Sequence, residues 1–184
     1  NHVRSLLLDR WGNFWIGTSG GGVSQYSGQQ FERFTEKNGL PGSYIYSIAV
    51  DQRNELWTGT SGGGVTHFDG NKFSRYGADS GFADQKVRAL FVDSDSLLWL
   101  GTDGGGLAVY NRDSFYIFTT TNGLAGNWVK AIAEDSQGRI WVASAGAGIT
   151  QITKTDSLHA PDFHTYKLSD GLKSNRVVDL HIDR

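Results

Sequence analysis

The sequence predicts an all-β fold made of four tandem copies of one unit, and a recurring tryptophan is the clearest sign of it. Trp15, Trp57, Trp99 and Trp141 follow one another at intervals of 42 residues. An aspartate stands six residues before each Trp, and a small-residue pair and a glycine cluster follow it. A fixed period in this range is typical of an array of identical supersecondary units.

The composition indicates short strands joined by tight turns. The chain has 25 Gly, only two Pro and 12% aromatic residues, and no stretch keeps a helical period over roughly 11 residues. A net charge of −2 favours neither nucleic acid nor an anionic membrane. The lack of Cys excludes disulfides and thiol chemistry. No apolar run approaches the roughly 20 residues needed to span a bilayer.

One copy can be divided into four strands. These are predicted at residues 45–50, 56–60, 65–68 and 72–76. Asp51 begins the turn after the first strand, since its side chain can cap backbone N–H groups. Asp69-Gly70 is typical of a two-residue hairpin loop. Four antiparallel strands in about 40 residues indicate a β-propeller blade, in which the Trp fills the space between neighbouring sheets and the nearby Gly lets a backbone approach.

The repeat boundaries predict a partial propeller: four four-stranded antiparallel blades plus one extra strand. The blades are expected at about 1–42, 43–84, 85–126 and 127–174, with a surplus first strand of a next blade at 175–184. The fourth copy carries a six-residue insertion around 155–162. Because the chain has no Met and begins in mid-pattern, we expect a piece of a longer protein. An open arc would expose apolar sheet faces, so we expect missing blades of the parent chain or self-association to cover them.

No motif supports catalysis, a cofactor or a metal. The run Gly-Thr-Ser-Gly-Gly-Gly at 17–22 lacks the Gly-Lys-Ser/Thr ending and the following helix of a phosphate loop, so we interpret it as a structural turn. Asp93 and Asp95 lack the Gly and Glu that complete a calcium loop. His159 and His164 lie in or beside the insertion and would be ligands only if folded together. Neither a Ser-His-Asp order nor a carboxylate pair stands out.

The topology of a blade predicts where a ligand would bind. The loop joining strands two and three lies at the same end as the loop leading to the next blade, so residues that vary there are the informative ones. The candidate ligand-binding residues are Tyr44, Tyr46, Lys86, Asp103, Asn127, Trp128 and Lys130. Exposed aromatic rings beside Asn, Lys and Asp suit a sugar face and its rim hydroxyls. The alternative is that Trp128 packs against the neighbouring blade.

The repeat resembles that of the two-component regulator propeller family. The string Asp-x-x-Gly-x-x-Trp-x-Gly-Thr-x-Gly-Gly-Gly-Val-x-x-Tyr spans Asp9 to Tyr26, and Phe-x-x-Phe and Asn-Gly-Leu follow between Phe31 and Leu40. The resemblance covers essentially the whole chain and weakens in the fourth copy at Ala143. It implies a periplasmic or otherwise extracytoplasmic sensor region of a hybrid or ordinary sensor histidine kinase, or of a related membrane-bound signalling protein. Such regions are often linked to sensing carbohydrate breakdown products, and the kinase chemistry itself is absent from this chain.

Three functions therefore remain open. The first is a non-catalytic sensory propeller that binds an oligosaccharide or another small molecule and signals to a downstream transmitter. The second is a protein-interaction or dimerisation scaffold without a small ligand. The third is an enzyme resembling the streptogramin lyases, which would need a His and a metal-binding acid to converge on one face.

Overall fold

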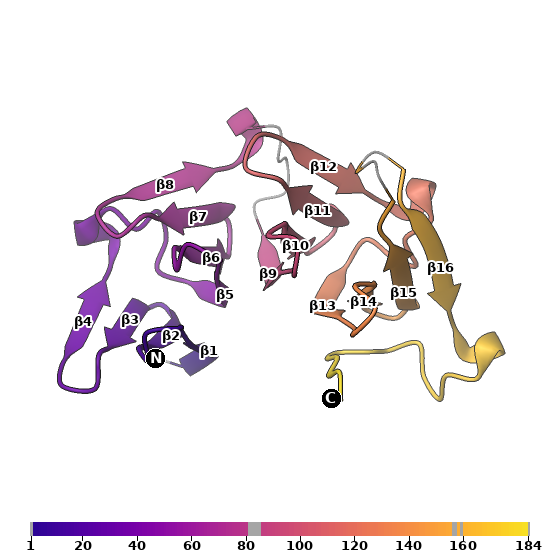
Figure 1. Ribbon diagram of the computed structural model, residues 1–184, viewed down its shortest axis with the longest axis horizontal. Helices are drawn as coiled ribbons and strands as arrows, with labels where there is room; N and C mark the ends of the chain where they lie inside the picture. Colours follow the sequence, from indigo (N-terminus) through magenta and orange to yellow (C-terminus); the bar gives the residue numbers. More distant parts are fainter. Residues whose placement is uncertain (1, 81–85, 156–157, 159, 184) are drawn as a thin grey trace.

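Each of the four sequence repeats folds into one antiparallel sheet. The computed structural model describes residues 2–80, 86–155, 158 and 160–183. In every sheet the four strands are hydrogen-bonded in chain order, so each repeat forms an up-and-down blade. The blades stand side by side in an open arc, with the first strands on its inner side and the fourth strands on its outer rim (Figure 1). The prediction of an all-β partial propeller is confirmed.

The elements follow the repeat closely. Blade 1 contains β1 (His2–Leu8), β2 (Phe14–Ser19), β3 (Gly22–Tyr26) and β4 (Phe31–Phe34). Blade 2 contains β5 (Ile45–Val50), β6 (Leu56–Thr60), β7 (Val65–Phe68) and β8 (Phe73–Tyr76). Blade 3 contains β9 (Val87–Val92), β10 (Leu98–Thr102), β11 (Leu107–Tyr110) and β12 (Phe115–Phe118). Blade 4 contains β13 (Val129–Glu134), β14 (Ile140–Ser144), β15 (Gly148–Thr153) and β16 (Asp162–Tyr166).

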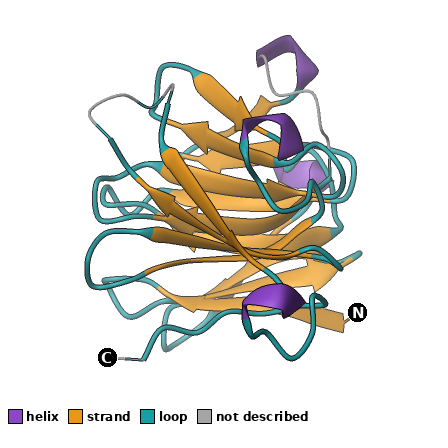
Figure 2. Cartoon of the chain, turned by 90° about the vertical axis from the view of Figure 1, so that its right-hand side faces the viewer, coloured by secondary structure: helices purple, strands orange, loops and turns teal. Residues whose placement is uncertain are grey.

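A 3-10 helix of one turn follows the fourth strand of each blade. These helices are η1 (Glu36–Asn38), η2 (Ala78–Ser80), η3 (Thr120–Asn122) and η4 (Leu168–Asp170). They lie toward one side of the stacked sheets (Figure 2). Within the described part of the chain, no helix combines the length and the apolar character needed to cross a membrane.

A hydrogen bond between aspartate and tryptophan recurs in all four blades. Asp93 accepts one from Trp99 Nε1 at 2.8 Å, and the same carboxylate accepts the backbone N–H groups of Asp95 and Leu97. In the other three blades the indole N–H lies 2.8–3.0 Å from the aspartate. One carboxylate thus satisfies the donors of the turn and orients the indole. The repeated Asp caps the turn, as the sequence predicts.

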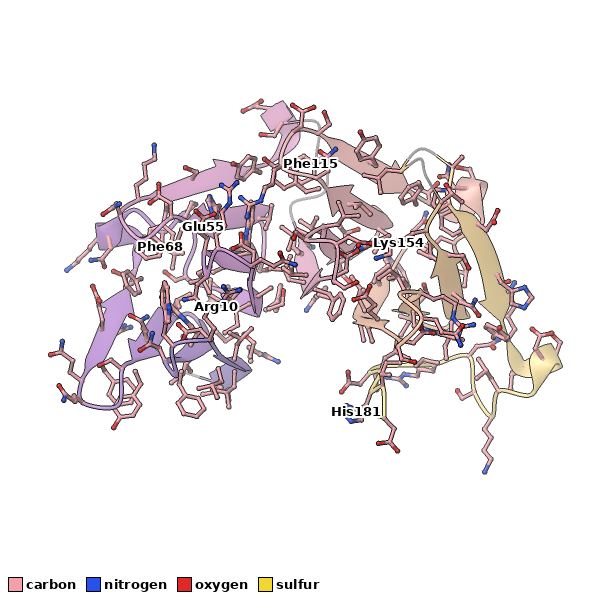
Figure 3. All side chains as sticks on the ribbon, in the orientation of Figure 1. Arg10, Glu55, Phe68, Phe115, Lys154 and His181 are labelled. Carbon is pink, nitrogen blue, oxygen red and sulfur yellow. The ribbon has the colours of Figure 1, made fainter. Side chains whose placement is uncertain are left out.

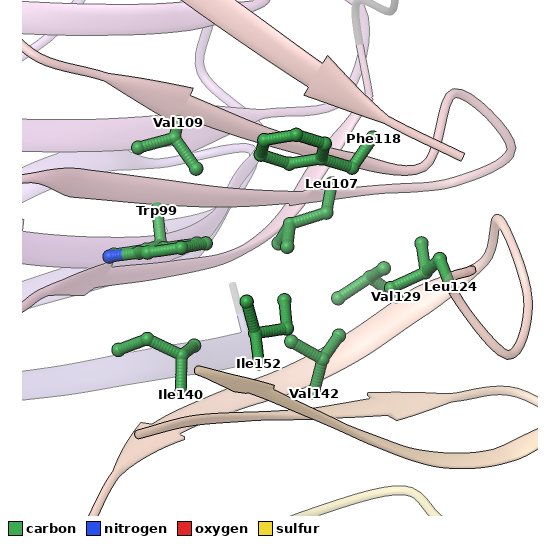
Figure 4. Packing of buried hydrophobic residues seen from close by; sticks show 9 residues of the cluster. All are labelled: Trp99, Leu107, Val109, Phe118, Leu124, Val129, Ile140, Val142 and Ile152. Carbon is green, nitrogen blue, oxygen red and sulfur yellow. The ribbon is translucent and has the colours of Figure 1, made fainter. Parts of the chain in front are cut away.

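The core lies between adjacent blades rather than inside any one of them. Between blades 3 and 4, Trp99 packs with Val129 and Ile140, and each is at most 1% exposed (Figure 4). Equivalent clusters centred on Trp15 and Trp57 join blades 1 and 2 and blades 2 and 3. Burying such apolar surface contributes roughly 25 cal/mol per Å². Each blade is therefore stabilised mainly by its neighbours.

The glycine two residues after the Trp permits this close packing. A Cβ on Gly101 would lie 2.5 Å from Val129 of blade 4, and a Cβ on Gly59 would lie 2.8 Å from Val87 of blade 3. Both distances are shorter than any carbon–carbon contact allows. The first strand of each following blade therefore rests on glycine backbone.

Backbone hydrogen bonds join the blades at one end of the arc, which we call the Gly-loop face. It carries the loops between second and third strands and the loops that enter the next blade. The N–H groups of Gly104 and Gly106 donate to the Asn127 carbonyl at 3.2 and 3.0 Å. Between blades 1 and 2, the equivalent pair of N–H groups donates to the carbonyl of Ser43. The predicted sharing of one face by these loops is confirmed.

The opposite end, which we call the turn face, carries the Asp-capped turns and the hairpins between third and fourth strands.

The sequence predicts a surplus first strand at 175–184, but the described residues 177–183 form no strand. Asn175 keeps the loop contacts of its equivalents, since its carbonyl accepts the N–H of Gly148 and its side chain accepts that of Leu168. Beyond it, a first strand is held by pairing with the second strand of its own blade, and the 184 residues contain no such partner. Of the predicted insertion, residues 156, 157 and 159 lie outside the described residues.

Candidate ligand site at the inner strand bulges

The first strand of every blade contains a β-bulge near its start. In β1, β5 and β13 the pairing register shifts around one residue, and in β9 the pairing passes from Val87 directly to Ala89. The bulged residues are Arg4, Tyr46, Arg88 and Lys130. A bulge leaves its extra residue outside the ladder and redirects the side chain. The inner strands therefore place a row of polar side chains along the Gly-loop end of the arc.

Two of these bulged residues contact one carboxylate, and a third contacts one of those two. Arg88 Nη2 lies 2.9 Å from Asp103 Oδ2, and Lys130 Nζ lies 3.2 Å from Asp103 Oδ1. The Arg88 guanidinium also lies over the Tyr46 ring, 4.0 Å from its centroid. Tyr46 in turn donates its hydroxyl to Ser61 Oγ at 3.0 Å. The network thus extends across blades 2, 3 and 4.

The network is charged and partly open to solvent. The side chains of Arg88, Asp103 and Lys130 are between 22% and 32% exposed. The hydrogen bond from Arg88 lowers the pKa of Asp103, burial opposes it, and Lys130 lowers the pKa further. Asp103 is therefore a carboxylate at neutral pH. Two cations share one anion here, which leaves the cluster with a positive charge.

Trp128 provides an exposed aromatic surface beside this network. Its side chain is 58% exposed, and its backbone forms a β-bridge with Asp103. A Cβ on Gly104 would lie 3.0 Å from its Nε1, so the indole edge lies against a glycine of the loop. One edge of the ring thus packs against the neighbouring blade, as in the alternative, while most of its surface stays exposed. An exposed indole next to charged hydrogen-bonding groups can stack on a flat apolar ligand surface.

The structure divides the seven candidate residues into groups. Tyr46, Asp103, Trp128 and Lys130 come together at the junctions of blades 2, 3 and 4. Tyr44 is also 58% exposed but pairs with Ser19 at the junction of blades 1 and 2. Lys86 forms the corresponding bridge with Ser61. Asn127 uses its side-chain oxygen to accept the N–H of Thr120, so it shapes the loop instead of presenting a free amide oxygen.

Arg88 belongs to this site and is not among the predicted residues. The repeat itself contained the signal, because positions 4, 46, 88 and 130 are related by the 42-residue period and all carry long polar or aromatic side chains. Recognising the bulge required the pairing register, which only the folded sheet provides.

A second group of titratable residues lies on the turn face. Asp51, Glu55 and His67 place potential metal-ligand atoms within 4.8 Å of one another. The guanidinium of Arg112 contacts the carboxylates of Asp51 and Glu55 at 2.5 and 3.4 Å, and His67 lies 3.0 Å from Glu55. Arg112 thus supplies the positive charge that a metal would bring. We interpret the group as an ion-pair network between blades 2 and 3.

The fold and the site define an open segment of β-propeller whose inner strands carry a polar cluster. The model of the two component regulator propeller matches residues 1–20, 39–62, 81–104 and 123–146, which together make up half of the chain. The chain belongs to this family, as the sequence predicts.

Solved structures share this architecture. The extracellular domain of the hybrid two component system BT3049 from B. thetaiotaomicron is 25% identical, with a TM-score of 0.82 over 96% of this chain and 24% of that one. The corresponding domain of BT4673 is 20% identical, with a TM-score of 0.74 over 90% of this chain and 25% of that one. A streptogramin B lyase is 16% identical, with a TM-score of 0.70 over 89% of this chain and 54% of that one. The last two likenesses show the fold alone.

The chain spans about a quarter of the length of the two-component domains that it matches. A comparison with curated proteins found no significant match.

Proposed function

We propose that this chain is a non-catalytic, ligand-binding part of the extracytoplasmic sensor region of a two-component signalling receptor. Membership of the two component regulator propeller family supports this role, as does the likeness to extracellular domains of hybrid two component systems. In this proposal the signal passes to a transmitter outside the 184 residues.

One observation carries the ligand-binding part of the proposal. Bulged residues of neighbouring blades converge on Asp103, and the exposed indole of Trp128 lies beside them. Oligosaccharides suit such a site, because a sugar ring offers an apolar face for stacking and hydroxyl groups for charged donors and acceptors. The surplus positive charge of Arg88 and Lys130 favours a sugar that bears a carboxylate.

The test is calorimetric titration with a panel of neutral and uronate-containing oligosaccharides. Trp128→Ala and Arg88→Gln should each weaken binding of the recognised sugar at least about tenfold. Phe31→Ala is the matched control, since it removes an aromatic ring that is 66% exposed in β4 of blade 1, away from the site. The proposal fails if no sugar of the panel binds and Trp128→Ala changes only the mass in solution.

A scaffold that associates with other blades is a second candidate, favoured by the outer face of blade 1. Leu6, Leu8 and Phe14 lie on the side of the sheet opposite Trp15 and are 66%, 59% and 47% exposed. Contiguous exposed apolar residues of this kind mark interaction surfaces. A mass of about 40 kDa in solution, twice the 20.1 kDa of the chain, would support pairing of two copies. Leu6→Lys should then return the protein to the monomer, and a stable monomer at high concentration would contradict the pairing.

A lyase-like reaction has less support. It would need a His and a metal-binding acid on one face, and in the described part of the chain the group of Asp51, Glu55 and His67 is already bridged by Arg112. Turnover of a streptogramin that a chelator abolishes would favour the enzyme over the sensor.

A further inference from the structure

A cavity of about 300 Å³ opens between blades 1 and 2 on the turn face. Its lining includes the aromatic rings of Trp15, Phe34 and Phe68 and the carboxylates of Glu32, Glu55 and Asp69. Figure 3 labels Glu55 and Phe68, which blade 2 contributes to the lining. The cavity is distinct from the bulge site, which lies toward the Gly-loop face.

The same position between blades 2 and 3 is almost closed. The remaining gap there measures about 10 Å³. Five of its seven lining residues have equivalents, 42 residues earlier, in the lining of the larger cavity. In one of these pairs, Arg112 of the small gap corresponds to Gly70 of the larger cavity. The two spaces are therefore the same place in successive repeats.

A cation from the hairpin of the following blade fills this place at the other two interfaces. Arg112 of blade 3 reaches back to Asp51 and Glu55 of blade 2. Lys154 of blade 4, at the corresponding hairpin position, reaches back to Asp93 and Asp95 of blade 3 at 3.0 and 2.6 Å. In each case the cation joins the carboxylate that also accepts the tryptophan indole N–H. Two interfaces of the same chain thus carry a bound cation at this point.

At the first interface the hairpin has the same backbone conformation, but Gly70 stands at the position where the other two hairpins carry a cationic side chain. Asp69 accepts the N–H groups of the residues two and three positions later, as Asn111 does in blade 3. Gly70 has a φ of +96°, and Arg112 has a φ of +74°. Among the described residues, the capping Asp9 receives the neutral amide of Asn54 across the interface, at 3.3 Å, in place of a cation, and Asp9 itself does not line the cavity. The place that a guanidinium or ammonium fills elsewhere is left as a cavity here.

The lining is suited to an organic cation. Of its three carboxylates, Glu55 is already paired with Arg112, which leaves Glu32 and Asp69 against the one guanidinium of Arg53, so the balance stays negative. Aromatic faces attract cations through the ring quadrupole, and charge-assisted hydrogen bonds to carboxylates are roughly twice as strong as neutral ones. We propose that this cavity binds an external organic cation, a guanidinium or alkylammonium group, in the place that Arg112 and Lys154 occupy at the other interfaces.

The experiment compares butylguanidinium with butylurea, its neutral analogue of similar shape, by calorimetry and by the indole N–H signals of ¹⁵N-labelled protein. Butylguanidinium should bind saturably, and butylurea at least about tenfold more weakly. Gly70→Arg should remove the binding, because the new side chain fills the cavity from within. Gly28→Arg is the matched control: Gly28 has the same hairpin position in blade 1, a φ of +87° and open space around it, but it does not line the cavity.

A reciprocal variant keeps the test decisive if Gly70→Arg does not fold. Arg112→Gly should create a second site for butylguanidinium between blades 2 and 3. A capped Gly-Arg-Gly peptide distinguishes two sources of the cation: tighter binding of the peptide indicates a basic side chain of a protein, and tighter binding of the free cation indicates a small molecule. The proposal is overturned if neither probe binds saturably, if butylurea binds equally well, or if Gly70→Arg folds and binds as before.

Discussion

The two ends of the propeller segment hold neighbouring blades together by different means. On the Gly-loop face the contacts are between backbones: a β-bridge recurs at all three junctions, and paired hydrogen bonds from two glycines to one carbonyl join blades 1 and 2 and blades 3 and 4. On the turn face the contacts are side-chain interactions with the capping aspartate, and each junction uses a different partner: Asn54, Arg112 or Lys154. Backbone groups are present whatever the sequence, whereas side chains vary freely between repeats. The Gly-loop face is therefore the constant frame of each junction, and the turn face is where the junctions differ.

The largest expected effect comes from a substitution on the Gly-loop face at Gly106, whose N–H group donates to the Asn127 carbonyl of the next blade. A Cβ on Gly106 would lie 2.2 Å from the Phe118 carbonyl oxygen, at a φ of +88°. Gly106→Ala should lower the free energy of unfolding by about 3–4 kcal/mol, because backbone strain and the steric clash add together. Gly12→Ala is the control, since Gly12 has a φ of +84° but no atom within 4 Å of the added Cβ. Chemical denaturation measures both, and equal losses would contradict the steric argument.

A smaller loss is expected when the most buried cation of the turn face is neutralised. Lys154 Nζ contacts Asp93, Asp95 and Glu134 within 3.0 Å, and its side chain is 15% exposed. Burial lowers the pKa of Lys154, but the three hydrogen bonds together outweigh it and raise the pKa. Lys154→Met should cost about 2–4 kcal/mol, because three carboxylates lose their shared counter-charge. The exposed Lys72→Met serves as the control in the same denaturation experiment. A loss no greater than that of the control would mean that the ion cluster adds no stability.

Acid should weaken blade 4 in a defined pH range. Burial raises the pKa of Asp135, but hydrogen bonds from Trp141 and Arg139 outweigh it and lower the pKa to about 2, from an ordinary value of 3.8. A lowered folded-state pKa gives stability that is present above the unfolded value and disappears as the pH falls toward the folded one. The free energy of unfolding should therefore decrease between about pH 4 and about pH 2. Asp135→Asn should make this decrease shallower, and an unchanged slope would exclude Asp135 as its source.

The smallest effect is expected where one cation replaces another. Lys154 shows that a lysine at this hairpin position can form an ion pair with the capping aspartate. Arg112→Lys should therefore cost less than about 1 kcal/mol, because one contact of a partly exposed pair is retained. Arg112→Gly should cost more, because Asp51 is 5% exposed and would lose its counter-charge. Thermal unfolding of both variants checks the order, and equal losses would show that the fork of the guanidinium is essential.

The repeat made much of the fold predictable from sequence. Strand positions, the Asp cap and the place of the Trp between sheets all follow from short-range rules applied to a 42-residue period. The surplus strand at 175–184 was the exception. The sequence of a first strand recurs there, but a strand forms only when its pairing partner is present. Repetition of residues therefore predicts structure only as far as the contacts repeat as well.

The candidate sites were less predictable. Asp103, Trp128 and Lys130 could be singled out as departures from the repeat, whereas Arg88 became visible only through the bulge that turns it toward Asp103. Likewise, aligning the repeats places Gly70 at the position of Arg112. That alignment does not indicate that the missing side chain leaves a cavity.

The sequence by itself determined the blade: its four strands, its capped turn, its glycine contacts and its family. These features depend on local turn chemistry and on a pattern that each copy repeats. Only the tertiary structure decided which side chains meet, because the bulges, the reach of Arg112 and Lys154 between blades, and the cavity beside Gly70 depend on how one blade is placed against the next. The ion pairs that Arg112 and Lys154 form between blades join residues about 60 positions apart, such as Asp51 and Arg112, and no local rule relates them.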